Sequence, residues 1–135
     1  MNSYKLLIVL LFNGLMIISN NLFSQNIDID KLPLFYNEVY GESEYELSSD
    51  IKIIYTEYLS RISFIKQGFE KNESYPLLST VGRKDKYNAN LKYDLTDFDL
   101  NLFNPLKYHF NYNKSINQFY RIDNTDFLLM IKSTN

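Results

Sequence analysis

The pattern of polar and apolar positions is most regular in the C-terminal thirty residues. Residues 107–112 alternate polar and aromatic side chains without a break, and residues 118–122 and 127–131 form two further strand-like runs. Residues 123–126, between these runs, are of turn-forming types. Because successive side chains of a strand point to opposite faces, the pattern predicts a three-stranded antiparallel meander.

Two short loops determine the register that we expect. A loop over residues 113–117 places Tyr112 opposite Gln118, and a loop over residues 123–126 places Ile122 opposite Phe127. A slip of one residue in either hairpin would scatter the apolar face. That face comprises Tyr108, Phe110, Tyr112, Tyr120, Ile122, Phe127, Leu129 and Ile131. The opposite face would carry Lys107, His109, Asn111, Phe119, Arg121, Leu128 and Met130, with His109 facing Arg121.

A helical period precedes this region. Ser48, Ser49 and Asp50 supply N-cap candidates, and one apolar stripe follows them at helical spacing. The stripe consists of Ile51, Ile54, Tyr55, Tyr58, Ile62, Ile65 and Phe69. We therefore expect a helix over residues 50–67, which would end at Gly68. A competing interpretation ends the helix near Ser60 and makes residues 61–66 a strand, but the helical period accounts for more residues.

These elements predict an α+β fold in which one amphipathic helix packs on the C-terminal three-stranded antiparallel meander. Residues 42–47 alternate like an edge strand, although an acidic loop fits them as well. In the irregular region before the meander, Asp97 or Asp99 would cap a single turn that ends before Pro105. We expect residues 34–135 to form one small domain and residues 25–33 a flexible lead-in.

The first 24 residues have the pattern of a signal peptide. Lys5 precedes an apolar run over residues 6–18, and a small residue stands before the expected cleavage at Gln25. As a helix the run would be roughly 20 Å long, shorter than the roughly 30 Å hydrocarbon core of a bilayer. We therefore expect cleavage and a secreted or periplasmic product, with no membrane span after signal cleavage.

Composition narrows the chemistry further. The chain has no cysteine, which excludes disulfides, thiolate metal sites and a cysteine nucleophile. Loss of Lys5 with the leader would leave 13 basic and 16 acidic residues, a net charge of −3. This balance gives no electrostatic reason to expect a nucleic-acid partner.

Asparagine, isoleucine and lysine are abundant, and residues 22–25 form a junction of Leu22, Phe23, Ser24 and Gln25. With residues 103–108 and 120–127, these features resemble uncharacterised small exported proteins of bacteroidete-type bacteria. The resemblance covers about a quarter of the chain, its C-terminal module. It implies export and carries no biochemical activity.

The sequence contains no complete catalytic or metal-binding motif. His109 is the single histidine, so a site with several histidines is impossible. Residues 97–101 begin like a calcium loop, but Leu102 and Tyr108 replace the required glycine and glutamate. The basic residues Arg83, Lys84, Lys86 and Lys92 lie among tyrosines, and we expect them to form a solvated surface.

We therefore expect no enzymatic activity and no cofactor, but a binding or interaction module with an envelope or extracellular protein partner. The candidate surface is the second face of the meander, with His109, Phe119, Arg121, Leu128 and Met130, a composition typical of interfaces. Alternatively, residues 77–103 cover that face as a second layer of core. Two other functions stay open: a small hydrolase that uses Asp97 and Asp99, and a tyrosine-lined glycan binder.

Overall fold

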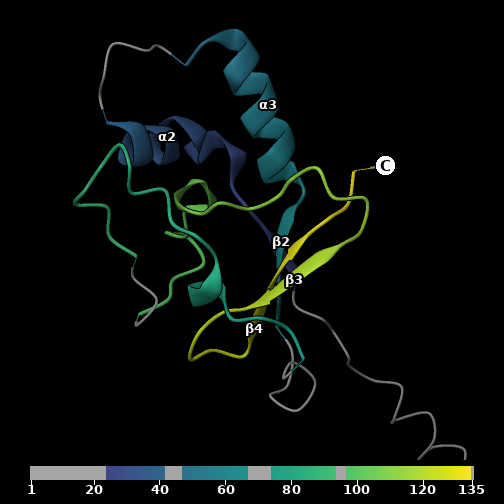
Figure 1. Ribbon diagram of the computed structural model, residues 1–135. Helices are drawn as coiled ribbons and strands as arrows, with labels where there is room; N and C mark the ends of the chain where they lie inside the picture. Colours follow the sequence, from purple (N-terminus) through teal and green to yellow (C-terminus); the bar gives the residue numbers. More distant parts are fainter. Residues whose placement is uncertain (1–23, 42–46, 67–73, 94–96, 135) are drawn as a thin grey trace, which may run out of the picture.

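The computed structural model describes residues 24–41, 47–66, 74–93 and 97–134 (Figure 1). It has two α-helices and a four-stranded antiparallel sheet, which confirms the α+β class. The helices are α2 (Leu32–Tyr40) and α3 (Ser49–Ser60), and the strands are β1 (Ser24–Asn26), β2 (Ile62–Lys66), β3 (Gln118–Arg121) and β4 (Phe127–Ile131). Short 3-10 turns are η1 (Ile29–Lys31), η3 (Leu78–Thr80) and η4 (Pro105–Lys107).

The sheet has the strand order β1-β2-β4-β3, so the C-terminal hairpin forms half of it. In that hairpin Gln118 pairs with Ile131 and Tyr120 with Leu129, as the predicted loop over residues 123–126 requires. The amide of Ile122 also donates to the carbonyl of Phe127 (3.0 Å). The register of the second predicted hairpin is therefore confirmed.

Strand β2 is the neighbour of β4 that the sequence interpretation missed. Ser48 caps α3 by accepting a hydrogen bond from the amide of Ile51 (3.4 Å), as predicted, but the helix ends at Ser60. The longer helix over residues 50–67 was thus wrong, and the competing strand interpretation was correct. β2 lies between β1 and β4 in the sheet, and Ile62, Ser63 and Phe64 are all buried although they alternate between its two faces. Burial on both faces removes the alternation that distinguishes a strand.

Residues 107–112 do not form the first strand of a meander. Asn104 begins the turn η4, and its side chain accepts a hydrogen bond from the amide of Leu106 (3.0 Å). The residues that follow still alternate between buried and exposed, with Tyr108, Phe110 and Tyr112 inside. The prediction of which side chains face inward was correct, but that of their strand partner was wrong.

The outer edge of β3 is instead occupied by an earlier segment. The amide of Arg121 donates to the carbonyl of Pro76 (2.8 Å), and Leu77 forms a parallel bridge with Arg121. His109 lies away from Arg121, and its amide donates to the carbonyl of Gly82 (2.8 Å). The predicted pairing of His109 with Arg121 was therefore wrong.

Residues 25–33, expected as a flexible lead-in, contribute to the fold. Gln25 pairs with Phe64 across the β1–β2 ladder, and Ile27 and Leu32 are buried. Pro33 stands in the first turn of α2, where its missing N–H leaves no donor unpaired. Parts of three predicted features lie outside the described residues. They are residues 1–23 of the predicted leader, residues 42–46 of the predicted strand over residues 42–47, and Gly68 and Phe69 at the end of the predicted helix.

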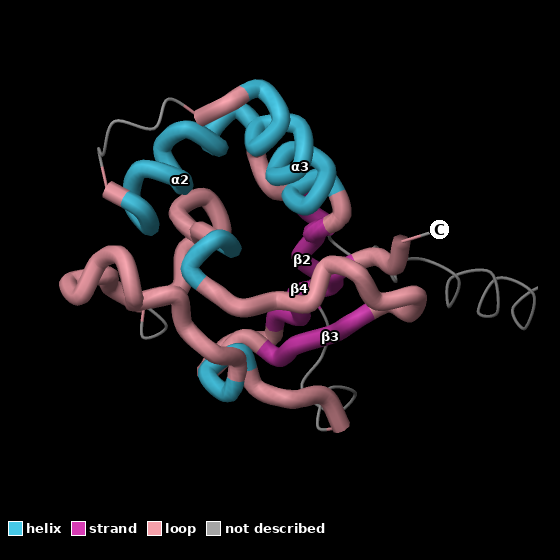
Figure 2. Tube along the Cα trace, turned by 45° about the horizontal axis from the view of Figure 1, so that its top comes forward, coloured by secondary structure: helices cyan, strands magenta, loops and turns pink. Residues whose placement is uncertain are grey.

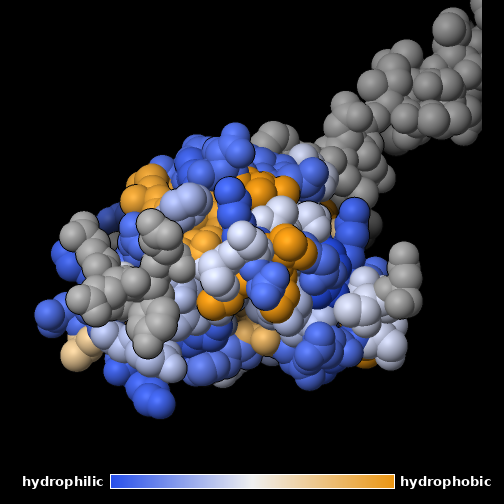
Figure 3. Space-filling model, turned by 90° about the horizontal axis from the view of Figure 1, so that it is seen from above, coloured by the Kyte–Doolittle hydropathy of each residue, from blue (hydrophilic) through white to orange (hydrophobic). Residues whose placement is uncertain are grey.

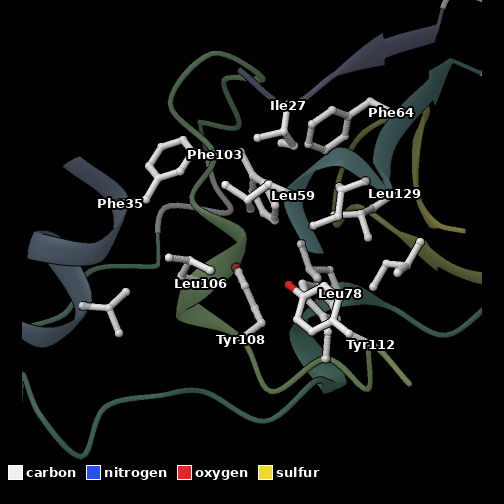
Figure 4. Packing of buried hydrophobic residues seen from close by; sticks show 14 of the residues in the cluster. Ile27, Phe35, Leu59, Phe64, Leu78, Phe103, Leu106, Tyr108, Tyr112 and Leu129 are labelled. Carbon is white, nitrogen blue, oxygen red and sulfur yellow. The ribbon is translucent and has the colours of Figure 1, made fainter. Parts of the chain in front are cut away.

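The core lies between the helices, one face of the sheet and the irregular segment over residues 97–112. The tube trace shows α2 and α3 together on one side of the strands (Figure 2). Fully buried side chains come from α3 (Leu59), β2 (Phe64), β4 (Leu129) and η4 (Leu106) (Figure 4). Asn104 ties α2 to this core, because its amide nitrogen donates to the carbonyl of Phe35 (2.9 Å).

Candidate functional site

The second face of the sheet holds four of the five residues that the sequence analysis selected. In the ladders, Phe119 pairs with Met130, and Arg121 with Leu128. The Phe119 ring contacts the ring of Tyr75, with 5.0 Å between centroids. The Arg121 Nε donates to the Tyr75 carbonyl (2.7 Å). This face is therefore partly engaged by the segment around Tyr75.

Leu128 and Met130 differ in exposure. Leu128 is fully buried, whereas Met130 is half-buried and borders an open hollow of about 690 Å³ at the end of β4. Arg61 also lines this hollow. Its guanidinium is already engaged, since Nε pairs with a carboxylate oxygen of Glu57 (3.0 Å) and Nη1 donates to the Tyr112 carbonyl (2.8 Å). Arg61 therefore fastens α3 to neighbouring segments and has little capacity left for a ligand.

His109 lies apart from the other four residues. It is exposed and stands beside Gly82, whose added Cβ would meet the imidazole at 3.5 Å. Tyr108, its neighbour, forms an antiparallel bridge with Arg83. The structure thus does not bring the five predicted residues together into one surface.

A different group of side chains forms a polar aromatic cluster beside the helices. We call it the tyrosine cluster, and it consists of Tyr36, Tyr40, Tyr55, Tyr58, Tyr87 and Lys84. Ring centroids are 4.5 Å apart between Tyr36 and Tyr40, 5.9 Å between Tyr36 and Tyr55, and 5.2 Å between Tyr40 and Tyr87. Two helices and the loop before residue 88 therefore supply one connected set of rings.

Tyr40 is at the centre of this cluster. Its hydroxyl lies 3.0 Å from that of Tyr55 and accepts a contact from Lys84 Nζ at 3.5 Å. Burial, the hydrogen bond with Tyr55 and the neighbouring tyrosines raise the pKa of Tyr40 well above its usual range. Burial lowers the pKa of Lys84. The cluster thus holds neutral hydroxyls and an ammonium group in partial isolation from water.

Tyr112 connects the cluster to the core. Its ring stacks on that of Tyr58 with 4.3 Å between centroids and 4° between planes. Its hydroxyl is buried and has no hydrogen-bond partner among the residues that the structure describes, and Figure 4 shows it directed toward the middle of the buried side chains. Burial raises the pKa of Tyr112 well above its usual range.

The segment that contains Asp97 and Asp99 ends in a turn over residues 99–102. The Asp99 carboxylate accepts a hydrogen bond from the amide of Asn101 (2.8 Å), and the Asp99 carbonyl accepts one from Leu102 (3.1 Å). Asp99 therefore caps a turn, as one of the two predicted candidates. Within the described ranges, no three His, Asp or Glu side chains gather so as to hold a metal ion.

The tyrosine cluster was missed because its members had been assigned to other roles. Tyr55 and Tyr58 had been placed on an apolar helical stripe, and Lys84 on a solvated surface. The spacing of four residues from Tyr36 to Tyr40 and of three from Tyr55 to Tyr58 puts each pair on one helix face. That spacing was the available signal, but α2 had not been predicted. The half-buried position of Lys84 follows from tertiary packing.

A scan against protein-family models finds no match, and searches of curated proteins and of solved structures find none either. Neither of the described helices has the length and apolar character needed to cross a lipid bilayer.

Proposed function

We propose that the chain is a non-enzymatic binding module of the cell envelope or exterior, and that the tyrosine cluster is its binding surface. The supporting observation is that tyrosines from separate segments gather at the surface and stay partly exposed. Tyr87 is 61% exposed although its ring contacts that of Tyr40. Tyrosine is enriched at interfaces because it combines a large rigid ring with a polar hydroxyl.

The surrounding helical surface supports a polar binding mode. Large apolar side chains that are exposed on the helices are Leu34, Ile53 and Ile54. Figure 3, which looks down on the helices, shows hydrophobic residues separated by hydrophilic ones. Apolar residues scattered in this way are ordinary on a protein surface. Recognition through rings and hydroxyls therefore suits this side better than recognition through a large apolar patch.

Site-specific crosslinking tests the binding surface. A photo-reactive amino acid placed at Tyr87 in the cell should form a defined adduct, because that ring is the most exposed of the cluster. The matched control is Leu102, a large exposed residue (73%) in the turn after Asp99. Equal adducts at both positions, or none at Tyr87, would contradict the proposal.

Export is tested by the mass of the product. The proposed cleavage yields a chain that begins at Gln25. This chain lacks Ser24, which pairs with Ile65, and retains the other two of the three residues of β1. We expect this mass in the periplasmic or extracellular fraction. An intact Met1 in the cytoplasmic fraction would remove the export part of the proposal.

A further inference from the structure

Three cations touch the tyrosine cluster: the Lys86 ammonium lies 5.5 Å from the Tyr87 ring centre and the Arg61 guanidinium 5.6 Å from that of Tyr58, while Lys84 contacts a hydroxyl. The Lys84 ammonium is half-buried and has no counter-charge among the described residues. The ion pairs within the described ranges involve Arg61, Lys66 and Lys107. The contact of Lys84 Nζ is with the Tyr40 hydroxyl at 3.5 Å, at the limit of hydrogen-bond length. A half-buried ammonium is thus held beside a neutral oxygen.

Lys107 shows what a compensated lysine looks like in the same region. Its Nζ pairs with the Glu38 carboxylate and donates to the carbonyl of Lys92 (2.8 Å). The backbone amide of Lys84 donates to the carbonyl of Lys107 (2.8 Å), so the two residues are neighbours. A charge taken from water is unfavourable unless it is paired. In these terms the described residues supply a counter-charge for Lys107, but none of them supplies one for Lys84.

An arriving anion would supply the missing partner. Burial lowers the pKa of Lys84, and a nearby negative charge would favour the charged ammonium again. The electrostatics of the cluster therefore favour a ligand with an acidic group close to Nζ.

The aromatic members favour a ligand with both apolar faces and hydroxyl edges. Every ring of the cluster is a tyrosine, whereas phenylalanines such as Phe64 and Phe103 contact one another in the core. Aromatic faces carry negative charge density that attracts weakly positive C–H edges, and tyrosine hydroxyls both donate and accept hydrogen bonds. A sugar ring offers C–H groups on its faces and hydroxyls on its rim. Tyr87, exposed and next to Tyr40, is placed to meet such a face.

We propose that the tyrosine cluster binds a carbohydrate that carries an acidic group, with the Lys84 ammonium on that group and the Tyr87 ring against the sugar. This inference rests on the proposed function and names its ligand class. The acidic group is a carboxylate or a sulfate, because either would supply the negative counter-charge that the Lys84 ammonium lacks among the described residues.

Titration calorimetry of the purified protein tests this assignment with three probes: an oligogalacturonate, a sulfated oligosaccharide and a neutral malto-oligosaccharide. We expect one or both acidic probes to bind, and the neutral probe to bind roughly tenfold more weakly or not at all. Lys84→Met keeps the aliphatic stem and should weaken acidic binding by roughly tenfold or more. Tyr87→Ala should weaken binding of the same probe.

Lys114→Met is the matched control, because Lys114 is exposed and its carbonyl accepts a hydrogen bond from the amide of Thr134 (3.1 Å), apart from the cluster. Lys114→Met should leave binding of the acidic probe unchanged. Lys84→Arg keeps the positive charge and should bind the acidic probe more tightly than Lys84→Met does. Thermal denaturation of each variant separates loss of binding from loss of folding.

The outcomes distinguish this inference from the proposed function. Equal binding of neutral and acidic probes, with no effect of Lys84→Met, would overturn the acidic group and leave the binding surface in place. Binding of a glutamate-rich peptide without binding of any oligosaccharide would overturn the carbohydrate. No binding of any probe, together with no adduct at Tyr87 in the crosslinking experiment, would overturn both.

Discussion

The sheet side and the helical side of this molecule bury aromatic and aliphatic residues in different ways. On the sheet side Ile62, Phe64, Leu129 and Ile131 are fully buried and carry no polar atoms in their side chains. On the helical side the tyrosine cluster is half-buried, with hydroxyls and an ammonium near one another. Hydrophobic burial explains the position of these four side chains, and the exception on this side is Ser63, whose buried hydroxyl has no hydrogen-bond partner among the described residues.

The second arrangement is not what stability alone would select. A hydroxyl or ammonium that leaves water without a full set of partners is unfavourable by about 1–3 kcal/mol or more. Natural proteins depart from consistent packing mainly at functional sites. The contrast between the two sides is therefore the physical reason for placing function at the tyrosine cluster and not on the sheet.

The largest expected effect is a cavity on the sheet side. Leu129 is fully buried in β4 between its partners Phe64 and Tyr120. Leu129→Ala should lower the free energy of unfolding by about 2–5 kcal/mol. Tyr87→Ala, an exposed change in the cluster, should stay within about 0.5 kcal/mol of the parent. Urea denaturation measures both, and a similar loss for the two variants would break the comparison.

Alkaline pH should act through Tyr108, which belongs to the core. Burial raises the pKa of Tyr108 to about 12 from its ordinary value of 10.0. The unfolded chain therefore loses this proton first as the pH rises, so stability is full below pH 10 and falls between pH 10 and about 12. Each unit of pKa displacement is worth about 1.4 kcal/mol, so the two units from 10.0 to about 12 give at most about 3 kcal/mol, in the lower part of the range expected for the cavity.

Denaturant unfolding at pH 9, 10 and 11 measures this slope. Tyr108→Phe removes the ionisable hydroxyl and should therefore reduce the loss of stability between pH 9 and pH 11. An unchanged slope would show that another group, such as Tyr112, governs alkaline unfolding.

Tyr112 lies where the two sides meet. Its substitution by phenylalanine should stabilise the protein, whereas Leu129→Ala should destabilise it. The Tyr112 hydroxyl is buried without a hydrogen-bond partner in the described part of the chain, so Tyr112→Phe removes a desolvated polar group and keeps the stack on Tyr58. We expect the free energy of unfolding to rise by about 1 kcal/mol. A loss of stability in thermal and urea denaturation would show that the hydroxyl has a partner in solution, such as an ordered water.

How far the sequence predicts this fold depends on how local each signal is. The β3–β4 register was predictable because a short turn and an alternating face determine it together. The end of α3 was not, because Ile62 fits a helical period with Ile65 and a strand alternation with Phe64. Only the pairing of β2 with β1 and β4, which are far away in the sequence, decides between them.

The site was less predictable than the fold. The inward direction of Tyr108, Phe110 and Tyr112 was correct, since alternation alone determines it. The tyrosine cluster, however, joins α2, α3 and the segment of Lys84 and Tyr87 through tertiary contacts that no sequence spacing encodes. His109 was predicted to belong to the binding surface on the second face of the sheet, but the structure places it apart from the other four predicted residues.

The smallest expected effect lies at the centre of the tyrosine cluster. Tyr40→Phe removes the hydroxyl that contacts both Tyr55 (3.0 Å) and Lys84 (3.5 Å). Because this region is half-exposed, water can replace the lost partner, and the free energy of unfolding should change by less than about 1 kcal/mol.

A double-mutant cycle with Tyr55→Phe isolates the hydroxyl pair, and we expect a coupling near 0.5 kcal/mol. Tyr58→Phe is the control, since its hydroxyl makes no hydrogen bond to the described residues. A coupling of several kcal/mol would mean that the cluster is a second core, and the contrast between the two sides would then disappear.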